Sequence, residues 1–355
     1  MIKYLGSKRT LVPVLGAIAS AVEAETALDL FSGTTRVAQE FKRRGIDVTA
    51  ADIATYSEVL AQCYIATDAR DVAPRELADA LDELSALPGH RGYFTRTFCE
   101  ESRYLQPKNG ERVDAIRNCL DAHYTGSPLF PVLLTALMLA ADRVDSTTGV
   151  QMAYLKQWAP RAQRDLELRT PDLLPGSGAA VRGDALALVK ALPRVDLAYL
   201  DPPYNQHRYF TNYHVWETLV RWDAPDHYGV ACKRVDARDE STKSAFNRKR
   251  EMPDALRSVI AGTQAGVVVV SYNDESWVTP EQLMTWLGEA GHQDVRLLSY
   301  DSKRYVGAQI GIHNPSGHKV GTVKRLRNTE YVVVAGDAER VAAAVASAEH
   351  PSLKG

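Results

Sequence analysis

The sequence predicts an α/β protein whose sheet is interrupted by an inserted helical domain. Short apolar and β-branched runs recur in the first and last parts of the chain, with turn or helix signals between them. The middle of the chain shows helical periodicity only. The chain has 355 residues, of which 45% are hydrophobic and 24% charged, so it is long enough for two ordinary globular domains.

The expected sheet begins with two runs near the N-terminus. Residues 26–31 are apolar and lead into a Ser-Gly turn, and residues 47–52 form the second run. A helical stretch lies between them, from about residue 36 to residue 44, and stops at Gly45. This order of strand, helix and strand is typical of an α/β sheet.

The pattern changes after residue 69. From there to residue 169 the chain is mostly amphipathic helix, with no β-like run; the clearest helices are expected at residues 76–87, 111–123 and 128–141. We therefore place a helical insert at residues 70–169. Residues 171–178 contain two prolines and two glycines and would link the insert back to the sheet.

Sheet signals resume after this linker. A buried run at residues 195–201 ends in a carboxylate, and residues 266–271 are the most strongly β-like run of the chain. Further strand-like segments follow the same pattern at residues 179–182, 294–300 and 330–335. We expect the sheet domain to comprise residues 1–69 and 170–340, followed by an Ala-rich tail, residues 341–355, that could form a terminal helix.

The composition argues against several classes of protein. The four cysteines form no C-x-x-C pair and the nine histidines show no H-x-x-x-H spacing, so neither a disulfide framework nor a metal site is expected. The longest mostly apolar run, residues 129–141, is too short to cross a bilayer, and no secretory signal is visible. A cytoplasmic protein with no membrane segment is therefore expected.

Two local patches are basic, although the formal net charge of the chain is −2. Between residues 303 and 328 there are six Lys or Arg and no acidic residue. Residues 233–250 carry seven more, partly offset by three acids. A run of one sign fits contact with nucleic-acid phosphates, but a solvated charged surface accounts for such a composition equally well.

The most specific motif is Asp201-Pro202-Pro203-Tyr204, which directly follows a buried strand-like run. Ligands of open α/β sheets bind at the carboxyl ends of the strands. A carboxylate and a backbone carbonyl held at a rigid angle by prolines provide two hydrogen-bond acceptors, and the tyrosine provides a stacking face. This arrangement fits an exocyclic amino group on a heterocycle. A simple turn capped by Asp is the alternative.

A second motif, Asp29, Phe31 and Gly33, also follows a strand-like run, and Asp52 stands at the end of the next one. Gly33 would let a ligand approach the backbone, and an acid in the position of Asp52 suits ribose hydroxyls. Because there is no G-x-G-x-x-G, a nucleoside without phosphates fits this turn, although an ordinary β-turn-α connection fits too. Asp184, after a third run, could accept from an adenine amino group, cap the following helix, or do both.

The order of these motifs resembles that of the Dam-like, alpha-group N6-adenine DNA methyltransferases. A basic and aromatic N-terminal cluster with Tyr4 and Lys8 comes first, followed by the D-x-F-x-G motif, the helical insert and the Asp-Pro-Pro-Tyr tetrapeptide. The resemblance covers most of the chain, including residues 149–159 and 212–217. One departure is Thr35, where many members carry a second glycine. The resemblance implies a Rossmann-like S-adenosylmethionine-dependent methyltransferase sheet, with S-adenosylmethionine as cofactor.

The resemblance also implies a role for each motif. The tetrapeptide would hold an adenine flipped out of double-stranded DNA while its amino nitrogen takes the methyl group directly, with no covalent intermediate. The cofactor would lie against Tyr4, Lys8, Asp29, Phe31, Gly33, Asp52 and Asp184. The insert is the candidate for target recognition. His214, just beyond the tetrapeptide, could line the base pocket. A cognate restriction endonuclease acting separately is an open possibility.

Cations of the insert and of the two basic patches are candidates for contact with the DNA. They are Arg91, Arg96, Arg103, Lys108, Lys156, Lys243, Arg248, Lys249, Lys303, Arg304, Lys319, Lys324 and Arg325. Ordinary helix packing with exposed arginines explains those of the insert equally well.

The sequence leaves other functions open. An N4-cytosine methyltransferase could use the same pocket, although that group more often carries Ser where this chain has Asp201. A catalytically silent DNA-binding subunit could retain the fold. RNA or a small heterocycle could be the substrate, and the missing G-x-G-x-x-G argues against a nicotinamide dehydrogenase.

Overall fold

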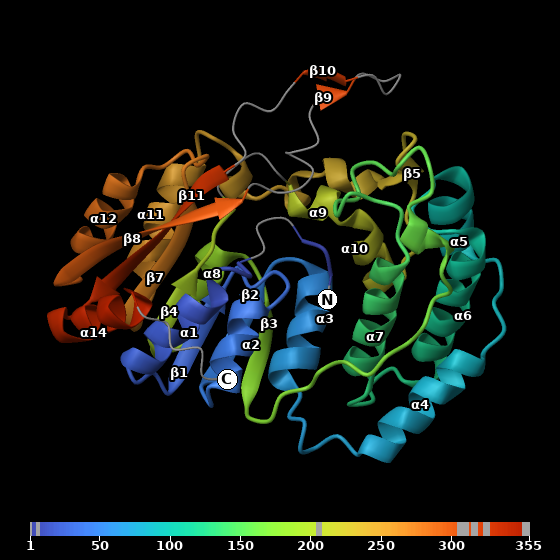
Figure 1. Ribbon diagram of the computed structural model, residues 1–355, viewed down its shortest axis with the longest axis horizontal. Coiled ribbons are helices and arrows are strands. Elements are labelled where there is room, and N and C mark those ends of the chain that lie inside the picture. Colours follow the sequence, from blue (N-terminus) through green and yellow to red (C-terminus); the bar gives the residue numbers. More distant parts are fainter. Residues whose placement is uncertain are drawn as a thin grey trace.

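The computed structural model describes residues 2–4, 8–203, 208–303, 312–313, 319–321 and 327–349. Its centre is a seven-stranded sheet with the strand order β3-β2-β1-β4-β7-β11-β8 (Figure 1). The strands are β1 (Thr26–Leu30), β2 (Asp47–Asp52), β3 (Gly178–Arg182), β4 (Val195–Leu200), β7 (Ala265–Asn273), β8 (Asp294–Lys303) and β11 (Arg327–Gly336). Neighbouring strands are parallel except around β11, which runs antiparallel to β7 and β8. The predicted α/β class is confirmed.

The strand order reverses between β1 and β4. β1 pairs in parallel with β2 on one side and with β4 on the other. Ligands of open α/β sheets bind outside the carboxyl ends of the strands at such a reversal. Three carboxylates singled out in the sequence belong to these strands: Asp29 lies in β1, Asp52 ends β2 and Asp201 follows β4. The topology therefore directs them to one edge of the sheet.

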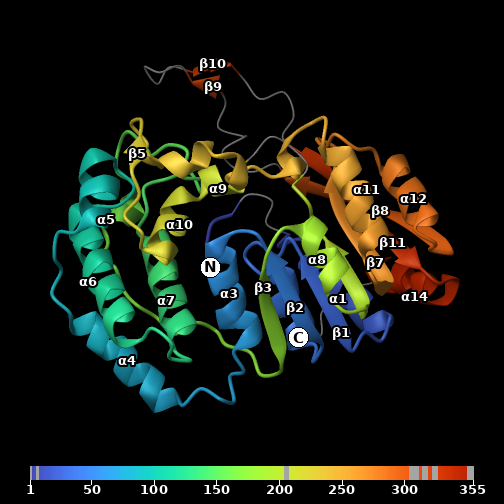
Figure 2. The same ribbon diagram turned by 180° about the vertical axis from the view of Figure 1, so that it is seen from behind.

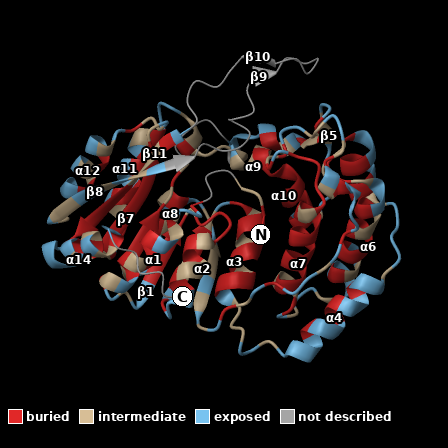
Figure 3. Cartoon of the chain, in the orientation of Figure 1, coloured by how far each residue is buried: buried red, intermediate tan, exposed pale blue. Residues whose placement is uncertain are grey.

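Two layers of helices cover the sheet. One layer contains α1 (Val12–Ala21), α2 (Arg36–Arg43) and α14 (Ala338–Glu349), and the other contains α8 (Ala185–Ala191), α11 (Met252–Gly262) and α12 (Pro280–Glu289). Along β7, Val267 and Val269 join the hydrophobic core beneath α1, α2 and α14, whereas Val268 and Val270 join the core beneath α8, α11 and α12. Burial on both faces explains the unbroken valine run of this strand. Figure 3 shows the buried strands between helices with exposed outer faces.

A helical segment separates β2 from β3 along the chain, and its described residues form no strand. Its elements are α3 (Thr55–Ala61), α4 (Pro74–Ala86), α5 (Tyr93–Thr95), α6 (Pro107–His123) and α7 (Phe130–Arg143), with π-helical turns at Gln62–Ala66 and Arg96–Glu101 and a 3-10 turn at Pro160–Gln163. α3 packs against β2, β3 and α7. In both views the helices α4 to α7 lie on the side of α3 away from β8 (Figures 1 and 2). One hydrophobic cluster includes residues of α1, α3 and α7, so these helices share a core with the sheet.

The chain between β4 and β11 supplies the remaining elements. They are α9 (Tyr209–Asn212), α10 (His214–Arg221), the two-stranded pairs β5 (His227–Tyr228) with β6 (Lys233–Arg234) and β9 (Ile312–His313) with β10 (Lys319–Gly321), and 3-10 turns at Val235–Arg238, Glu240–Thr242 and Ala245–Asn247. Of the helices in the described part of the chain, none is both long and apolar enough to cross a membrane.

The C-terminal helix α14 corrects one expected boundary. Residues 341–349 do not form a separate tail, because α14 packs against α1 and against β8 and β11. Its side chains Val341, Ala344 and Ala348 are buried in the same core as α1. The alanine-rich composition therefore reflects close packing of one helix on another.

We expect Ala344→Glu to lower the free energy of unfolding by about 3–5 kcal/mol, because it buries an unpaired carboxylate between α14 and α1. The matched variant Ala342→Glu places the same charge on an exposed position of the same helix and should change stability by less than about 0.5 kcal/mol. Urea denaturation followed by circular dichroism measures both. Equal effects of the two variants would show that α14 is not packed as described.

Candidate active site

A cavity of about 240 Å³ lies at the carboxyl ends of β1, β2 and β4. The seven residues that the resemblance assigns to the cofactor all line it: Tyr4, Lys8, Asp29, Phe31, Gly33, Asp52 and Asp184. Asp201 and Pro203 line the same cavity, and Pro202 is buried. Tyr204 lies outside the described residues. Two motifs that are far apart in the sequence thus meet in one space.

The turn after β1 has an unusual backbone. Phe31, Gly33 and Thr35 all have positive φ angles, of 73°, 51° and 60°. This region favours glycine, and it is strained for a β-branched residue such as threonine. Thr35 is fully buried, its hydroxyl donates to the Thr34 carbonyl over 2.7 Å, and it accepts from Gln39 over 2.9 Å. Position 35 therefore keeps this conformation with threonine, and strain is stored beside the cavity.

The N-terminal segment enters the cavity through Tyr4. Its ring stacks on Tyr213, with the centroids 4.6 Å apart, and on Tyr209 at 5.3 Å. Its hydroxyl lies 3.2 Å from the hydroxyl of Tyr56. A Cβ at Gly33 would come within 3.1 Å of the Tyr4 ring, so the absence of a side chain at Gly33 leaves room for this ring. Sequence analysis missed Tyr209 and Tyr213, because no local pattern connects them to Tyr4.

Two of the carboxylates also hold the backbone of the site. Asp52 accepts hydrogen bonds from the Gly33 and Ala54 amides, each over 2.9 Å, and so ties the end of β2 to the turn after β1. Burial raises the pKa of Asp52, and these two hydrogen bonds oppose the shift. Asp184 accepts from the Leu186 amide over 2.9 Å and caps α8. Its capping role and its place in the cavity wall coexist.

Asp29 is the most unusual acid of the cavity. Its side chain is 1% exposed; one carboxylate oxygen accepts from the Ala38 amide over 3.0 Å, and the other is buried with no hydrogen-bond partner among the described residues. Burial raises the pKa of Asp29 to about 8, and the hydrogen bond from Ala38 opposes this shift. A buried acid with a vacant acceptor suits a cationic ligand group, which would stabilise the ionised form.

Asp201 is held by an ion cluster. The ammonium of Lys8 lies 3.1 Å from Oδ1 of Asp201 and 3.3 Å from a carboxylate oxygen of Glu330 in β11. The Lys8 side chain is 6% exposed, so the cluster is largely shielded from water. Burial raises the pKa of Asp201, and the nearby Lys8 opposes this shift. Lys8 therefore contacts the acid of the tetrapeptide directly. Sequence analysis missed Glu330, since no motif surrounds it.

Other residues that sequence analysis missed complete the wall. Arg208, Tyr209 and Phe210 line the cavity just after the tetrapeptide, together with Glu217 and Arg221 of α10. Part of the second basic patch lines it as well, through Thr242, Ser244, Phe246 and Asn247. The Phe246 ring meets the Phe31 ring edge to face, 5.0 Å between centroids. A hydrophobic contact thus brings this patch against the turn after β1.

His214 does not line the cavity, so the expectation that it belongs to the base pocket is wrong. Its side chain is fully buried, and Nε2 lies 2.9 Å from the Gln151 carbonyl and 3.4 Å from the Tyr104 hydroxyl. Burial lowers the pKa of His214 to about 3, so the ring is neutral at physiological pH. Its ring packs against the rings of Phe98 and Tyr104, between α10 and the insert.

Three of the insert cations proposed for DNA contact make contacts within the protein. Arg91 forms an ion pair with Glu100 at 2.7 Å, and Lys108 forms one with Asp165 at 2.6 Å. Arg103 donates to the Lys156 carbonyl over 2.7 Å and lies over the ring of Trp158. Arg96 is exposed. Pairs of this kind are exposed and weak, so they can give way to phosphates.

The cations of the two basic patches are only partly described. Lys243 and Arg248 both pair with Glu240, and Arg248 also pairs with Glu251 at 3.0 Å. Lys249 is exposed. Arg304, Lys324 and Arg325 lie outside the described residues, as do the side chains of Lys303 and Lys319.

One group of potential metal ligands lies outside the cavity. Donor atoms of Glu101, His227 and Cys232 come within 4.8 Å of one another, which the sequence spacing did not suggest. His227 Nε2 lies 2.8 Å from a carboxylate oxygen of Glu101, and burial raises the pKa of the Cys232 thiol. As described, the group is a carboxylate–imidazole hydrogen bond beside a neutral thiol.

The fold and the cavity define the class of protein: an open α/β sheet whose point of strand reversal carries a turn with positive φ angles and, on the next strand, the carboxylate of Asp201. A family model described as D12 class N6 adenine-specific DNA methyltransferase matches residues 4–285. The chain belongs to this family. The resemblance seen in the sequence is thereby confirmed, and "Dam-like" is only a loose description of it.

Several relatives are modification enzymes. The chain is 28% identical over 319 residues to the modification methylase StsI of Streptococcus sanguinis, covering 84% of this chain and 48% of that protein. It is 28% identical over 312 residues to the type II methyltransferase M.FokI of Planomicrobium okeanokoites, covering 81% and 47%. It is 27% identical over 312 residues to the type II methyltransferase M.NlaIII of Neisseria lactamica, covering 84% and 91%. The chain thus spans about half the length of the first two relatives.

Among solved structures, the chain is similar to precorrin-6y C5,15-methyltransferase from Geobacter metallireducens, with 11% identity and a TM-score of 0.32 over 95% of this chain and 93% of that one. A likeness this weak supports no assignment, and the sheet topology described above stands without it.

We expect the variant Asp29→Asn to gain stability relative to the wild type as the pH rises from 5 to 8. The pKa of Asp29 is about 8 in the fold but about 3.9 in an unfolded chain, so over this range the unfolded wild type is already ionised while the folded protein still keeps the proton, and the wild type loses stability as the pH rises. The difference in free energy of unfolding should change by on the order of 2–4 kcal/mol, measured by urea denaturation at several pH values.

The matched control is Asp196→Asn, at the amino end of β4. Burial by itself would raise the pKa of Asp196, but hydrogen bonds from Thr26 and Glu25 outweigh it and hold this pKa below its usual range. Asp196 is therefore ionised above pH 5 in both the folded and the unfolded protein. The difference in free energy of unfolding between Asp196→Asn and the wild type should stay constant over this range. A constant difference for Asp29→Asn as well would contradict the description of Asp29.

Proposed function

We propose that the protein is a site-specific DNA methyltransferase that transfers a methyl group from S-adenosylmethionine to the N6 amino group of a flipped adenine in double-stranded DNA. The observation that carries the proposal is that one cavity is lined both by the nucleoside-type turn around Gly33 and by the Asp201 carboxylate. A donor and an amino acceptor bound there would be adjacent, and proximity lowers the barrier to direct transfer. A cytoplasmic location belongs to the same proposal.

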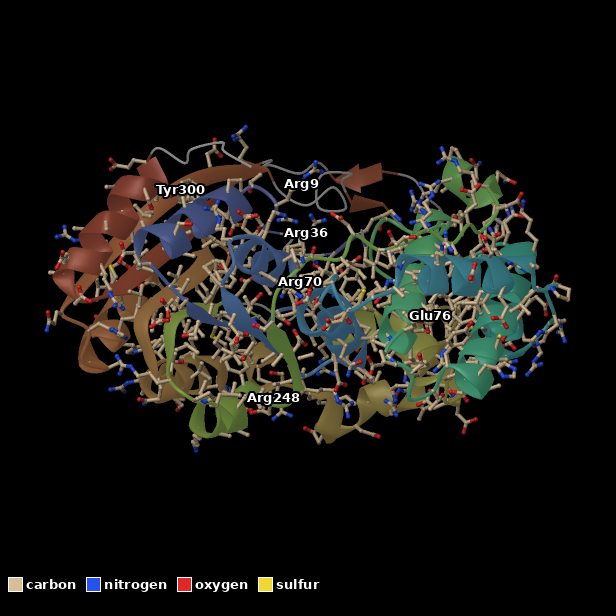
Figure 4. The ribbon with its side chains drawn as sticks, turned by 90° about the horizontal axis from the view of Figure 1, so that it is seen from below. Arg9, Arg36, Arg70, Glu76, Arg248 and Tyr300 are labelled. Carbon is tan, nitrogen blue, oxygen red and sulfur yellow. The ribbon has the colours of Figure 1, made fainter. Side chains whose placement is uncertain are left out.

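Unpartnered groups in the cavity wall support S-adenosylmethionine as the cofactor. Its methionine end carries an ammonium and a carboxylate. Asp29 has a buried acceptor oxygen without a partner, and the buried Nε of Arg36 has no hydrogen-bond partner among the described residues. Arg36 begins α2, whose first turn contains no acid, and the neighbouring Arg9 adds positive charge (Figure 4). An acid and a guanidinium in one cavity complement the two charges of that ligand.

The nucleoside end of the cofactor would lie across β2 and β3. Asp52 would accept from the ribose hydroxyls and Asp184 from the adenine amino group, while both keep their hydrogen bonds to the backbone. When bound, S-adenosylmethionine supplies an electrophilic methyl group on a sulfonium. Tyr4 and Phe31 would shield that region from water, because their rings line the same cavity.

On the acceptor side, Asp201 and the Pro202 carbonyl would each accept a hydrogen bond from the adenine amino group. The amino lone pair is delocalised into the ring, and two acceptors favour a pyramidal nitrogen that can attack. Lys8 carries one positive charge against the two negative charges of Asp201 and Glu330, so the cluster is negative overall. A negative cluster stabilises the positive charge that develops on the nitrogen.

DNA would be the macromolecular partner. Residues 70–169 are the candidate for target recognition, and the exposed cations named above are candidates for phosphate contact, exchanging weak surface ion pairs for phosphates on binding. Several relatives are type II methyltransferases, so a cognate restriction endonuclease acting separately is the candidate second partner.

The first test is expression in a host that lacks adenine methylation, with modified bases mapped by long-read sequencing. We expect methyladenine at one short sequence context. Asp201→Asn should lower turnover at least about 100-fold while DNA binding is kept, because it weakens the acceptor for the amino group. Asp196→Asn, at the other end of the same strand, should stay within about twofold of the wild type. Modified cytosine in place of adenine would favour the N4-cytosine alternative.

A second test separates backbone strain from ligand contact. Gly33→Ala and Gly45→Ala both place a side chain at a positive φ, of 51° and 84°, and each should cost about 1–2 kcal/mol of stability. The Cβ at Gly33 also meets the Tyr4 ring, whereas the one at Gly45 meets no atom within 4 Å among the described residues. Calorimetric titration with S-adenosylmethionine should therefore show weaker binding, by about tenfold or more, for Gly33→Ala alone. Equal affinities of both variants would refute this role of the turn.

A further inference from the structure

A chain of buried hydroxyls stands behind Asp201. Ser271 Oγ donates to Oδ1 of Asp201 over 3.0 Å, and the hydroxyl of Tyr199 lies 2.6 Å from Ser271 Oγ. Tyr199 pairs with Val269 across β4 and β7, so Ser271, two residues further along, projects from the same face of the sheet. Tyr199 is 1% exposed and Ser271 is fully buried. Adjacent strands of the central sheet therefore place both hydroxyls beneath the acid.

The direction of these hydrogen bonds follows from their chemistry. An ionised carboxylate only accepts, so the single hydroxyl proton of Ser271 is committed to Asp201. The Ser271 oxygen must then accept from Tyr199, whose own hydroxyl proton points toward it. Each bond in such a chain polarises the next, which strengthens the donation to the carboxylate.

These hydrogen bonds also determine which oxygen of Asp201 is engaged by the protein. Oδ1 receives both Ser271 and Lys8, from β7 and from the N-terminal segment. Neither of these two contacts involves Oδ2. Two donors on one oxygen fix the rotation of the carboxylate and leave the other oxygen for a ligand.

We propose that Tyr199 and Ser271 are positioning residues for methyl transfer, which act through Asp201 by holding its carboxylate in one orientation and in the ionised form. The inference rests on the function proposed above. Neither hydroxyl needs to touch the adenine. Three charged or titratable groups also face this carboxylate: Lys8, Glu330 of β11 and, further away, Asp29 of β1. All three stay unchanged in the test.

The test compares Tyr199→Phe, Ser271→Ala and the double variant. Each single variant should lower kcat about 10- to 100-fold, the usual effect of losing a hydrogen bond to a charged group, with KM for DNA and for the cofactor within about twofold. Removing either donor favours the protonated carboxyl, so the acid limb of the pH–rate profile should move to higher pH. Because Tyr199 acts only through Ser271, the double variant should be no slower than Ser271→Ala.

Two further variants separate positioning from packing. Tyr272→Phe removes a hydroxyl from an equally buried tyrosine on β7 that contacts Met252 on the other face of the sheet, and it should leave kcat and the pH profile unchanged. Ser271→Thr keeps the hydroxyl and should recover most of the activity. Tyr199→Phe keeps the ring, so it remains informative if Ser271→Ala does not fold.

Several results would overturn the inference while leaving the proposed function intact. They are wild-type kcat and pH profile for Tyr199→Phe, independent multiplicative effects in the double variant, or an equal loss in Tyr272→Phe. By contrast, a folded wild-type protein that binds S-adenosylmethionine but methylates no adenine would overturn the proposed function and this inference with it. The wild-type measurement thus distinguishes the two failures.

Discussion

The cluster of Lys8, Asp201 and Glu330 is the interaction on which the rest of the site depends. It joins the N-terminal segment, the end of β4 and the antiparallel strand β11, three segments that are far apart along the chain. Burying a carboxylate alone would favour its neutral form, and the shielded ammonium counters this for Asp201. Because β11 is inserted between β7 and β8, Glu330 reaches the edge of the sheet where the ligand cavity lies.

The turn after β1, which forms another part of the cavity wall, has a strained backbone. Positive φ angles at Phe31 and Thr35 are costly for residues with side chains. The backbone amides of Gly33 and Ala38 donate hydrogen bonds to Asp52 and Asp29, and these bonds hold the turn in place. The same acids face the cavity, so one set of carboxyl groups both supports the turn and presents hydrogen-bond acceptors to a ligand. Such coupling supports the turn without the glycine repeat of dinucleotide-binding proteins.

The helical insert is not an independent body. Its core is continuous with the core beneath the sheet, and α3 packs against both. Side chains expected to face DNA, such as Arg91 and Lys108, are held in exposed ion pairs. A surface of paired charges has little long-range attraction for nucleic acid, in keeping with the formal net charge of −2. It would gain affinity only where these ion pairs are exchanged for contacts with phosphates.

By itself the sequence determined the α/β class, the helical stretch between β2 and β3, and the approximate positions of the strands; β2, at Asp47–Asp52, coincides with its expected range. It also identified Asp29, Asp52 and Asp201, because strand periodicity and strand-ending carboxylates are local patterns. Only the tertiary structure placed Glu330 and the hydroxyls of Tyr199 and Ser271 around Asp201, since strands far apart in sequence create those contacts and no local spacing encodes them. For the same reason the packing of α14 and the burial of His214 could not be read from neighbouring residues.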